Sequence, residues 1–253
     1  MARIQRVSPL GSLRVAFGFL TRIPVGDPSA GGTREVKVAS AVPWFPIVGA
    51  LIGGAQAGVW WLLVQGTTPL VAAAVSTAVA ALITGAFHHD GLADIADAFG
   101  GGWTVEQRME ILKDSRLGTY GTSAVVLAFG LEIAALSSFE PTQGAFAVVA
   151  MHSLGRGLAV LAMLRSSVAG DGLGAAYMSD IPRVPAMLAV IVSGIVAAAC
   201  LGSSALAIVP AMFSALIVVA LSHRKIGGIT GDVLGAITVV SGVVLLVAAT
   251  LQF

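Results

Sequence analysis

The sequence has few charged residues and only one cysteine. Charged residues make up 11% of its 253 positions and hydrophobic residues 57%, whereas about 25% of the residues of an ordinary soluble domain are charged. This composition excludes a typical water-soluble globule. Lys and Arg number 14 and Asp and Glu 13, so no basic excess favours nucleic acid as a partner. Because Cys200 is the one cysteine, an intrachain disulfide and a multi-cysteine zinc site are also excluded.

Three long stretches of the chain contain no Asp, Glu, Lys or Arg. They cover residues 38–89, 184–223 and 233–253, and a helix needs about 20 apolar residues to cross a bilayer. Two further runs are long enough but contain Glu132 and Arg156. The sequence therefore predicts an all-α, polytopic membrane helix bundle with about seven spans. We place these spans at residues 42–64, 69–87, 118–137, 144–164, 184–201, 205–222 and 233–251.

The Lys and Arg residues predict the orientation of this bundle. Basic residues near span ends stay on the cytoplasmic side, and residues 1–41 carry six of the 14. With this segment inside, every Lys and Arg lies on the cytoplasmic side, apart from Arg156 in a span near it. We thus expect one membrane-embedded domain over residues 1–253. Its segment 1–41 is cytoplasmic or interfacial, with a short helix in the lipid headgroups, and its site segment 88–117 faces the cytoplasm.

The polar residues that could carry chemistry concentrate between residues 88 and 121. Two histidines, His88 and His89, precede Asp90, Asp94 and Asp97. In a helix these aspartates lie within about 60° of arc, so their like charges repel one another and favour a bound cation. Mg²⁺ fits best, because it shares oxygen ligands between carboxylates and substrate phosphates. The alternative is an acidic helix end that is solvated or paired with nearby basic residues. The histidines could be ligands, a general base or interfacial polar residues.

A short basic segment follows the acidic run. Thr104 and Gln107 fit a capping box, which predicts a helix from there to about Arg116. Lys113 and Arg116 near its end suit a clamp for phosphate or pyrophosphate oxygens. The alternative is that these cations only stabilise the C-terminus of the helix.

Charged residues in or beside the other spans are further candidates. A charge inside a span costs at least about 2–3 kcal/mol and is usually functional or paired, which makes Arg156 a candidate for function. Glu132 lies nearer the opposite face, so we expect it to have a structural pairing. The glycine-rich turn 224–232 contains Arg224, Lys225 and Asp232 and suits an approach to phosphates. It is not a Walker A loop, because GxxxxGK[ST] is absent from the chain.

Together these motifs resemble the cobalamin synthase family, the adenosylcobinamide-GDP ribazoletransferases of corrinoid biosynthesis. The resemblance rests on the acidic run 88–97, on Lys-Asp-Ser-Arg at 113–116 and on Gly-Thr-Tyr-Gly at 118–121. Residues 19–24, which include Arg22, and residues 227–236 are similar to motifs near the two ends of that family. The match keeps the order of the motifs over most of the chain.

This resemblance implies a membrane transferase that joins adenosylcobinamide-GDP to α-ribazole or its 5′-phosphate, with Mg²⁺ as cofactor. The products are adenosylcobalamin or its phosphate, and GMP. By this resemblance the metal ligands are Asp90, Asp94 and Asp97, and the catalytic residues are His88, Asp90, Asp94, Asp97 and Asp114. The substrate-binding residues are Arg22, Lys113, Ser115, Arg116, Arg156, Arg224, Lys225 and Asp232. His88 or one carboxylate takes the proton of the attacking hydroxyl. Membrane lipids surround the chain, and a homo-oligomer is compatible with the sequence.

Two other classes of protein share some of these features. A CDP-alcohol phosphotransferase also has an aspartate cluster in a membrane bundle, but its DxxDGxxAR pattern is not reproduced around Asp90. A secondary transporter could use Glu132, Arg156 and a carboxylate cluster to couple transport to an ion. Its sites are expected near the midplane of the membrane, whereas most of the polar residues here map to one face.

Overall fold

The computed structural model describes residues 8–25, 34–169, 178 and 181–251. These residues fold into helices, and the one β feature among them is an isolated bridge between Val168 and Ile229. The all-α prediction is therefore confirmed. The α-helices are α1 (Pro9–Leu20), α2 (Arg34–Ala41), α3 (Phe45–Leu63), α4 (Pro69–Thr84), α5 (Phe87–Gly101), α6 (Val105–Ile111), α7 (Thr119–Ser137), α8 (Pro141–Arg165), α10 (Arg183–Leu201), α11 (Ile208–Ile226) and α12 (Gly231–Ala249).

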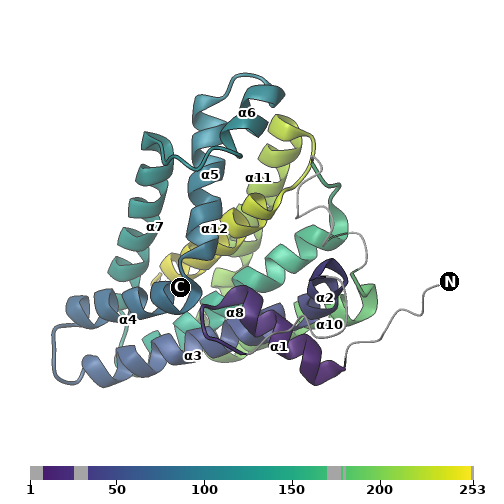
Figure 1. Ribbon diagram of the computed structural model, residues 1–253. Coiled ribbons are helices and arrows are strands. Elements are labelled where there is room, and N and C mark those ends of the chain that lie inside the picture. The colour runs from purple at the N-terminus through teal and green to yellow at the C-terminus, as the bar shows by residue number, and fades with distance from the viewer. Residues whose placement is uncertain (1–7, 26–33, 170–177, 179–180, 252–253) are drawn as a thin grey trace.

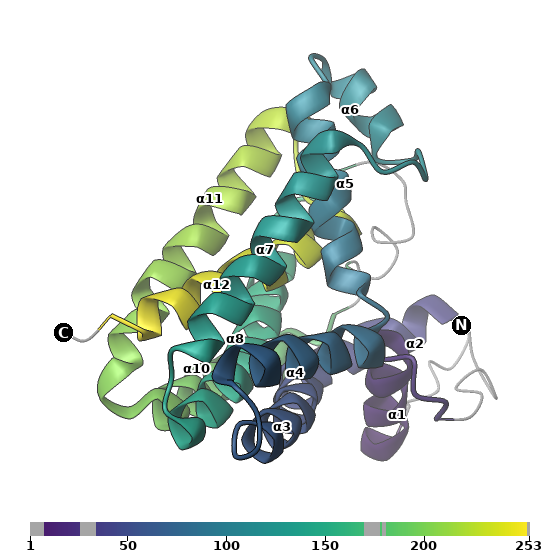
Figure 2. The same cartoon turned by 90° about the vertical axis from the view of Figure 1, so that its left-hand side faces the viewer.

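The helices form two groups that meet at a steep angle. In Figures 1 and 2, α3, α4 and α8 lie across the lower part of the molecule, whereas α5, α7 and α11 rise above them. The short helix α6 lies at the upper end of this second group, and α1 and α2 lie beside the first. Helix α12 packs against α5, α8 and α11 and so joins the two groups.

Five helical stretches among the described residues are long and apolar enough to cross a membrane. They are Val38–Leu63, Thr119–Ser137, Pro141–Arg165, Arg183–Ile226 and Gly231–Ala249, and α4 with α5 makes a sixth if this bent pair is one span. The polytopic prediction is confirmed, and the predicted number of seven is higher than this count. The count is lower because residues 183–226 enter it as one stretch of 44 residues. This stretch consists of α10, a short 3-10 segment (Gly202–Ala207) and α11, and the two helices correspond to the predicted spans 184–201 and 205–222.

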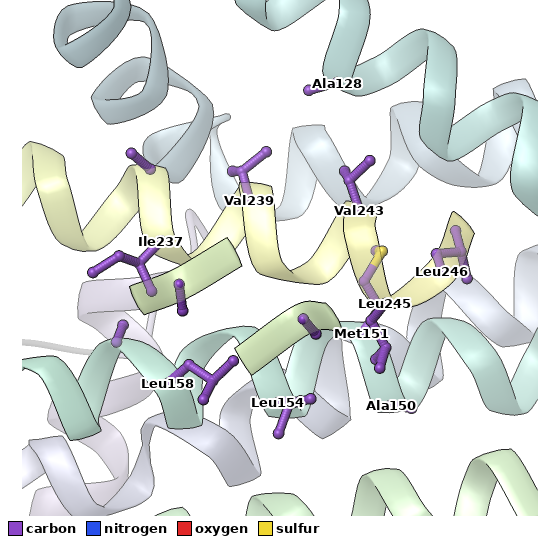
Figure 3. Close-up of a cluster of buried hydrophobic side chains, with 14 of the residues drawn as sticks. Ala128, Ala150, Met151, Leu154, Leu158, Ile237, Val239, Val243, Leu245 and Leu246 are labelled. Atoms are coloured by element: carbon purple, nitrogen blue, oxygen red, sulfur yellow. The ribbon is translucent and has the colours of Figure 1, made fainter. Parts of the chain in front are cut away.

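The core lies where α8 and α12 cross. Both helices are mostly buried, and Figure 3 shows Met151, Leu154 and Leu158 of α8 opposite Ile237 and Leu245 of α12. A side chain that is buried on all sides must be small or apolar, because no water is present to solvate it. This explains why both helices consist largely of alanine, glycine and aliphatic residues.

The chain turns by 90° between α4 and α5. Gly85 ends α4 in the left-handed region, with φ of 63°, and Ala86 follows with φ of 55°. Glycine adopts this conformation readily, because it has no Cβ. The backbone N–H of Arg22 donates to Ile83 O over 2.7 Å and so fixes the end of α1 to this corner. The predicted span 69–87 is therefore too long, because α4 ends at Thr84.

Helices α5 and α12 approach each other closely through two glycines. A Cβ at Gly91 would lie 2.9 Å from both Cα and O of Asp232, and a Cβ at Gly235 would lie 3.0 Å from His88 O. Only residues without a Cβ allow two backbones to come this near. The contact places Asp232, in the first turn of α12, directly beside α5.

The carboxylate of Asp97 fixes the start of α7. Its Oδ2 accepts from the N–H of Gly118 over 2.7 Å, and its Oδ1 accepts from the N–H of Gly121 over 2.9 Å. The first N–H groups of a helix have no partner within the helix, so a carboxylate there both caps the chain and interacts favourably with the helix dipole. Asp97 thereby joins α5 to α7.

The capping box of α6 is confirmed, but its predicted end is wrong. The Thr104 side chain accepts from Gln107 N, and the Gln107 side chain accepts from Thr104 N. The helix ends at Ile111, not near Arg116. The reason is that Asp97 draws Gly118 to α5, and an extended chain covers more distance per residue than a helix.

The packing of α5 on α12 generates a stability prediction. Because the new methyl group meets backbone atoms, we expect Gly91→Ala to lower the free energy of unfolding by about 1–3 kcal/mol. Gly130→Ala on α7 is the matched control, since no atom lies within 4 Å of a Cβ there. Thermal unfolding in detergent measures both variants. Equal midpoints for the two variants would contradict this packing.

The cap at Asp97 generates a second prediction. We expect Asp97→Ala to destabilise the protein by about 1–2 kcal/mol, the usual loss for an N-terminal cap, and Asp97→Asn to destabilise it less because one oxygen remains. Glu110→Ala on the exposed side of α6 is the control. Thermal unfolding in detergent is again the measurement, and an unchanged midpoint for Asp97→Ala rules out the capping role.

Candidate active site

An acidic cluster forms where α5 meets the first turn of α12. Asp94 is half-buried and lies within electrostatic reach of Asp90, Asp232 and Asp97. Thr230 Oγ1 donates to Asp232 Oδ2 over 3.3 Å and also caps α12. The sequence places Asp90, Asp94 and Asp97 on one helix face, and the structure brings Asp232 to that same face. Neighbouring carboxylates in a partly desolvated place favour a cation.

The donor chemistry of this cluster fits Mg²⁺. Carboxylate oxygens are the ligands that Mg²⁺ prefers, and one or two of them with substrate phosphates usually complete its shell. No three His, Cys, Asp or Glu side chains of the described residues are arranged to hold a metal ion by themselves. Both oxygens of Asp97 already accept backbone hydrogen bonds. Each of these oxygens keeps a further lone pair, so Asp97 remains a candidate ligand with Asp90, Asp94 and Asp232 for an ion whose remaining ligands come from substrate.

A groove of about 530 Å³ opens beside Asp90. The end of α1, the corner between α4 and α5, and one side of α7 form its walls. Arg22 and Asp90 provide its charged groups, and three aromatic rings line it: Phe19, Phe87 and Phe129. Arg22 lies against Gly85, where a Cβ would collide with its side chain. The groove thus combines an apolar wall with one cation and one carboxylate, which suits a ligand with an aromatic part and a phosphate.

The two adjacent histidines both line an inner cavity, but only His89 also lines the groove. His89 lines the groove and stacks on Phe129, with ring centroids 4.2 Å apart. His88 is buried and lines two inner cavities with Arg156. The prediction assigns the proton transfer to His88 or a carboxylate. In the structure His89 lines the same groove as Asp90, so His89 is a further candidate beside the predicted ones.

A small inner cavity of about 40 Å³ lies next to the groove. Thr84, His89 and Phe129 line both spaces, whereas Glu132 and Arg156 line the cavity but not the groove. Arg156 is 2% exposed, and its Nη1 donates to His152 O over 3.0 Å. Two buried nitrogen atoms, Arg156 Nε and His89 Nε2, have no hydrogen-bond partner among the residues that the structure describes. The predicted candidate Arg156 is therefore buried beside a polar cavity.

A chain of hydrogen bonds leads from Arg156 to Glu132. Arg156 Nη1 lies 3.1 Å from His152 Nδ1, and His152 Nε2 lies 2.6 Å from Gln56 Oε1. Gln56 Nε2 donates to Glu132 Oε1 over 2.8 Å, and Thr77 Oγ1 donates to the same oxygen over 2.9 Å. The predicted structural pairing of Glu132 is thus confirmed, since Glu132 connects three helices.

The basic segment after α6 is exposed. Asp114 and Arg116 form an ion pair with an N···O distance of 2.5 Å, and Arg116 N also donates to Asp114. The hydrogen bonds from Arg116 lower the pKa of Asp114 to about 2. Lys113 and Ser115 are exposed, and the next residue after Arg116, Leu117, lines the groove. Asp114 therefore orients a cation at the edge of the groove.

The two cations at the end of α11 are not equivalent. Lys225 Nζ donates to Phe99 O over 2.8 Å and lies over the Phe99 ring. Arg108 of α6 donates to Lys225 O over 3.0 Å. Lys225 thus holds the end of α11 against the end of α5, whereas Arg224 is exposed.

Sequence reasoning missed three polar residues near the cavity. Gln56, Thr77 and His152 lie within apolar spans and form the hydrogen-bond chain described above. The spacing of His152 and Arg156, one helical turn apart in α8, is a signal that could have revealed the first contact. The partners on α3 and α4 carry no such local signal.

Comparison with known proteins gives a consistent answer. Residues 12–250 match the family described as cobalamin-5-phosphate synthase. Three relatives carry the name adenosylcobinamide-GDP ribazoletransferase. One from Bradyrhizobium diazoefficiens is 39% identical over 251 residues, covering 96% of this chain and 95% of the relative. One from Ralstonia nicotianae is 37% identical, with 88% of each chain covered. One from Shewanella halifaxensis is 36% identical, again with 88% of each covered.

No solved structure matches the chain. The family match spans nearly the whole sequence, and it includes the acidic cluster, the basic segment and the groove. It agrees with the resemblance carried by the acidic and Lys-Asp-Ser-Arg motifs. The chain therefore belongs to the cobalamin-5-phosphate synthase family.

Proposed function

We propose that this chain transfers the adenosylcobinamide phosphoryl group from adenosylcobinamide-GDP to α-ribazole or its 5′-phosphate. The reaction releases GMP and depends on Mg²⁺. Family membership and the name of the relatives support the reaction. The observation that carries the proposal for the site is the cluster of Asp90, Asp94 and Asp232 beside a groove that contains Arg22.

The bond changes follow from the substrates. A hydroxyl oxygen of the acceptor attacks the phosphorus atom next to cobinamide, and a new P–O bond forms. The bond from that phosphorus to the bridging oxygen of the diphosphate breaks, and GMP leaves with this oxygen. The hydroxyl proton passes to a base. His89 is our candidate for this base, because it lines the groove with Asp90, and Asp90 is the alternative.

The charged residues of the site have three roles: metal binding, phosphate binding and structural support. One or two carboxylates of the group Asp90, Asp94 and Asp232 would hold Mg²⁺ together with substrate phosphates, and the ion would offset negative charge on the diphosphate. Arg22, Lys113 and Arg116 neutralise phosphoryl oxygens and orient them. Ser115 and Arg224 lie exposed and can add contacts to the nucleotide. Asp97 accepts from the backbone at the start of α7, and Lys225 donates to the backbone of α5. Both contacts hold the helices of the site in place.

We further propose that the site faces the cytoplasm of a bacterial cell. The predicted orientation puts the Lys and Arg residues on that side. The GDP-bearing and ribazole substrates are polar and reach the site from water. The bundle of five or six candidate spans then anchors the enzyme in the inner membrane.

A single assay tests the proposed reaction. Purified protein in detergent is incubated with adenosylcobinamide-GDP, α-ribazole 5′-phosphate and Mg²⁺, with and without a chelator. We expect GMP and the joined nucleotide in equal amounts, and neither product when the chelator is in excess. Because no sealed compartment is present, product formation also separates a transferase from a transporter. Absence of both products under every condition would reject the proposal.

Removal of one charge from the acidic cluster tests the metal site. We expect Asp94→Asn and Asp232→Asn to lower kcat on the order of 100-fold at saturating Mg²⁺, because charge stabilisation is lost in the transition state. Glu106→Gln, an exposed change on α6, is the control. Steady-state rates of GMP release measure the effect. Wild-type rates in both aspartate variants would remove these residues from the metal site.

The basic segment gives a separate prediction. We expect Lys113→Ala and Arg116→Ala to raise the KM for adenosylcobinamide-GDP about 10-fold, the usual effect of losing one charged hydrogen bond. The KM for α-ribazole 5′-phosphate should stay within about 2-fold, because the contact that each variant loses is with adenosylcobinamide-GDP. Initial rates with each substrate varied in turn give both constants. If neither constant moves, the segment does not bind phosphate.

A further inference from the structure

The inner cavity contains a buried cation without an anionic partner. Arg156 is 2% exposed, and its Nη1 contacts only the carbonyl and the ring of His152. In the part of the chain that the structure describes, the one ion pair is that of Arg116 with Asp114. A buried charge is costly unless a counter-charge and hydrogen bonds compensate it. Glu132 also lines the cavity, but its Oε1 accepts from Gln56 and Thr77 and it forms no ion pair with Arg156 among the described residues. Arg156 therefore lacks a direct counter-ion.

Two nitrogen atoms from different helices are available to bind an anion. Arg156 Nε of α8 and His89 Nε2 of α5 are buried without hydrogen-bond partners among the described residues, and both residues line the cavity. A guanidinium N–H is always a donor, and one ring nitrogen of a neutral histidine is a donor. Donors of this kind form strong bonds with phosphate oxygens.

The size and position of the cavity identify which phosphate can enter. Its volume is about 40 Å³, and one water molecule requires roughly 10–15 Å³ of such space. The cavity therefore has room for about three water molecules, which matches the three free oxygens of a terminal phosphate. The two phosphates of the donor are substituted on both sides, by cobinamide and by guanosine. Only a terminal phosphate can enter a small space at the inner side of the groove.

We propose that this cavity binds the 5′-phosphate of the acceptor, so that Arg156 and His89 select α-ribazole 5′-phosphate over α-ribazole. This inference rests on the proposed transferase function. The ribose then lies beside His89, which lines both the cavity and the groove. If Nε2 donates to the phosphate, the other ring nitrogen is an acceptor and can take the hydroxyl proton.

The test compares the two acceptors with the full chain in detergent. We expect the wild type to have a higher kcat/KM with α-ribazole 5′-phosphate than with α-ribazole. Arg156→Gln should lower the value for the phosphorylated acceptor about 10-fold or more, as expected for a lost charged hydrogen bond, and change that for α-ribazole less than about 2-fold. Arg165→Gln, at the exposed end of the same helix, should leave the ratio unchanged.

A second variant keeps the test valid if Arg156→Gln does not fold. Ala80 lines the cavity and is 5% exposed, so Ala80→Val fills the space while Arg156 remains. We expect the same selective loss with the phosphorylated acceptor. An equal loss with both acceptors in every folded variant would show a structural role and overturn the inference. A higher KM for adenosylcobinamide-GDP alone would assign Arg156 to the donor and also overturn it.

A binding measurement separates this inference from the proposed reaction. We expect α-ribazole 5′-phosphate, without the donor, to raise the thermal unfolding midpoint of the wild type but not of Arg156→Gln. Unphosphorylated α-ribazole should have a smaller effect on both. Such stabilisation without any product in the transfer assay would support the cavity and reject the reaction. Product formation without selective stabilisation would support the reaction and reject the cavity.

Discussion

The close contact between α5 and α12 is the feature on which the acidic cluster depends. Gly91 packs on the backbone of Asp232, and Gly235 packs on the backbone of His88. The approach brings a carboxylate from the last helix next to Asp94, far from it in the sequence. A larger residue at either glycine separates the helices and so increases the distance between the carboxylates. The electrostatic character of the site is thus set by backbone packing.

Opposite charges lie on the two sides of the first turns of α5. The aspartates lie toward the groove and α12, whereas Arg156 lies beside His88 in the interior. Neither side is neutralised by the other, because Arg156 makes no ion pair among the described residues. This separation suits a reaction with two differently charged partners: a cation for the aspartates and an anion for the arginine. The groove connects the two regions.

Local patterns in the sequence predict much of the fold and part of the site. The spacing of Asp90, Asp94 and Asp97 predicts the helix that contains them, and Thr104 with Gln107 predicts the start of α6. Apolar length predicts the polytopic bundle. These features depend on interactions between residues a few positions apart.

Other features depend on contacts that no local pattern reveals. The role of Asp97 comes from its bonds to Gly118 and Gly121, and the division between His88 and His89 comes from the 90° turn before α5. Tertiary packing decides each of these cases, so the sequence alone leaves them open.

The chain between α6 and α7 is fixed at both ends to one helix. Arg108 donates to Gly102 O at the end of α5, and Asp97 of α5 holds Gly118. The exposed cations between these points are therefore attached to the helix that bears the aspartates. The short length of chain between the two attachment points limits how far Lys113 and Arg116 can lie from those carboxylates.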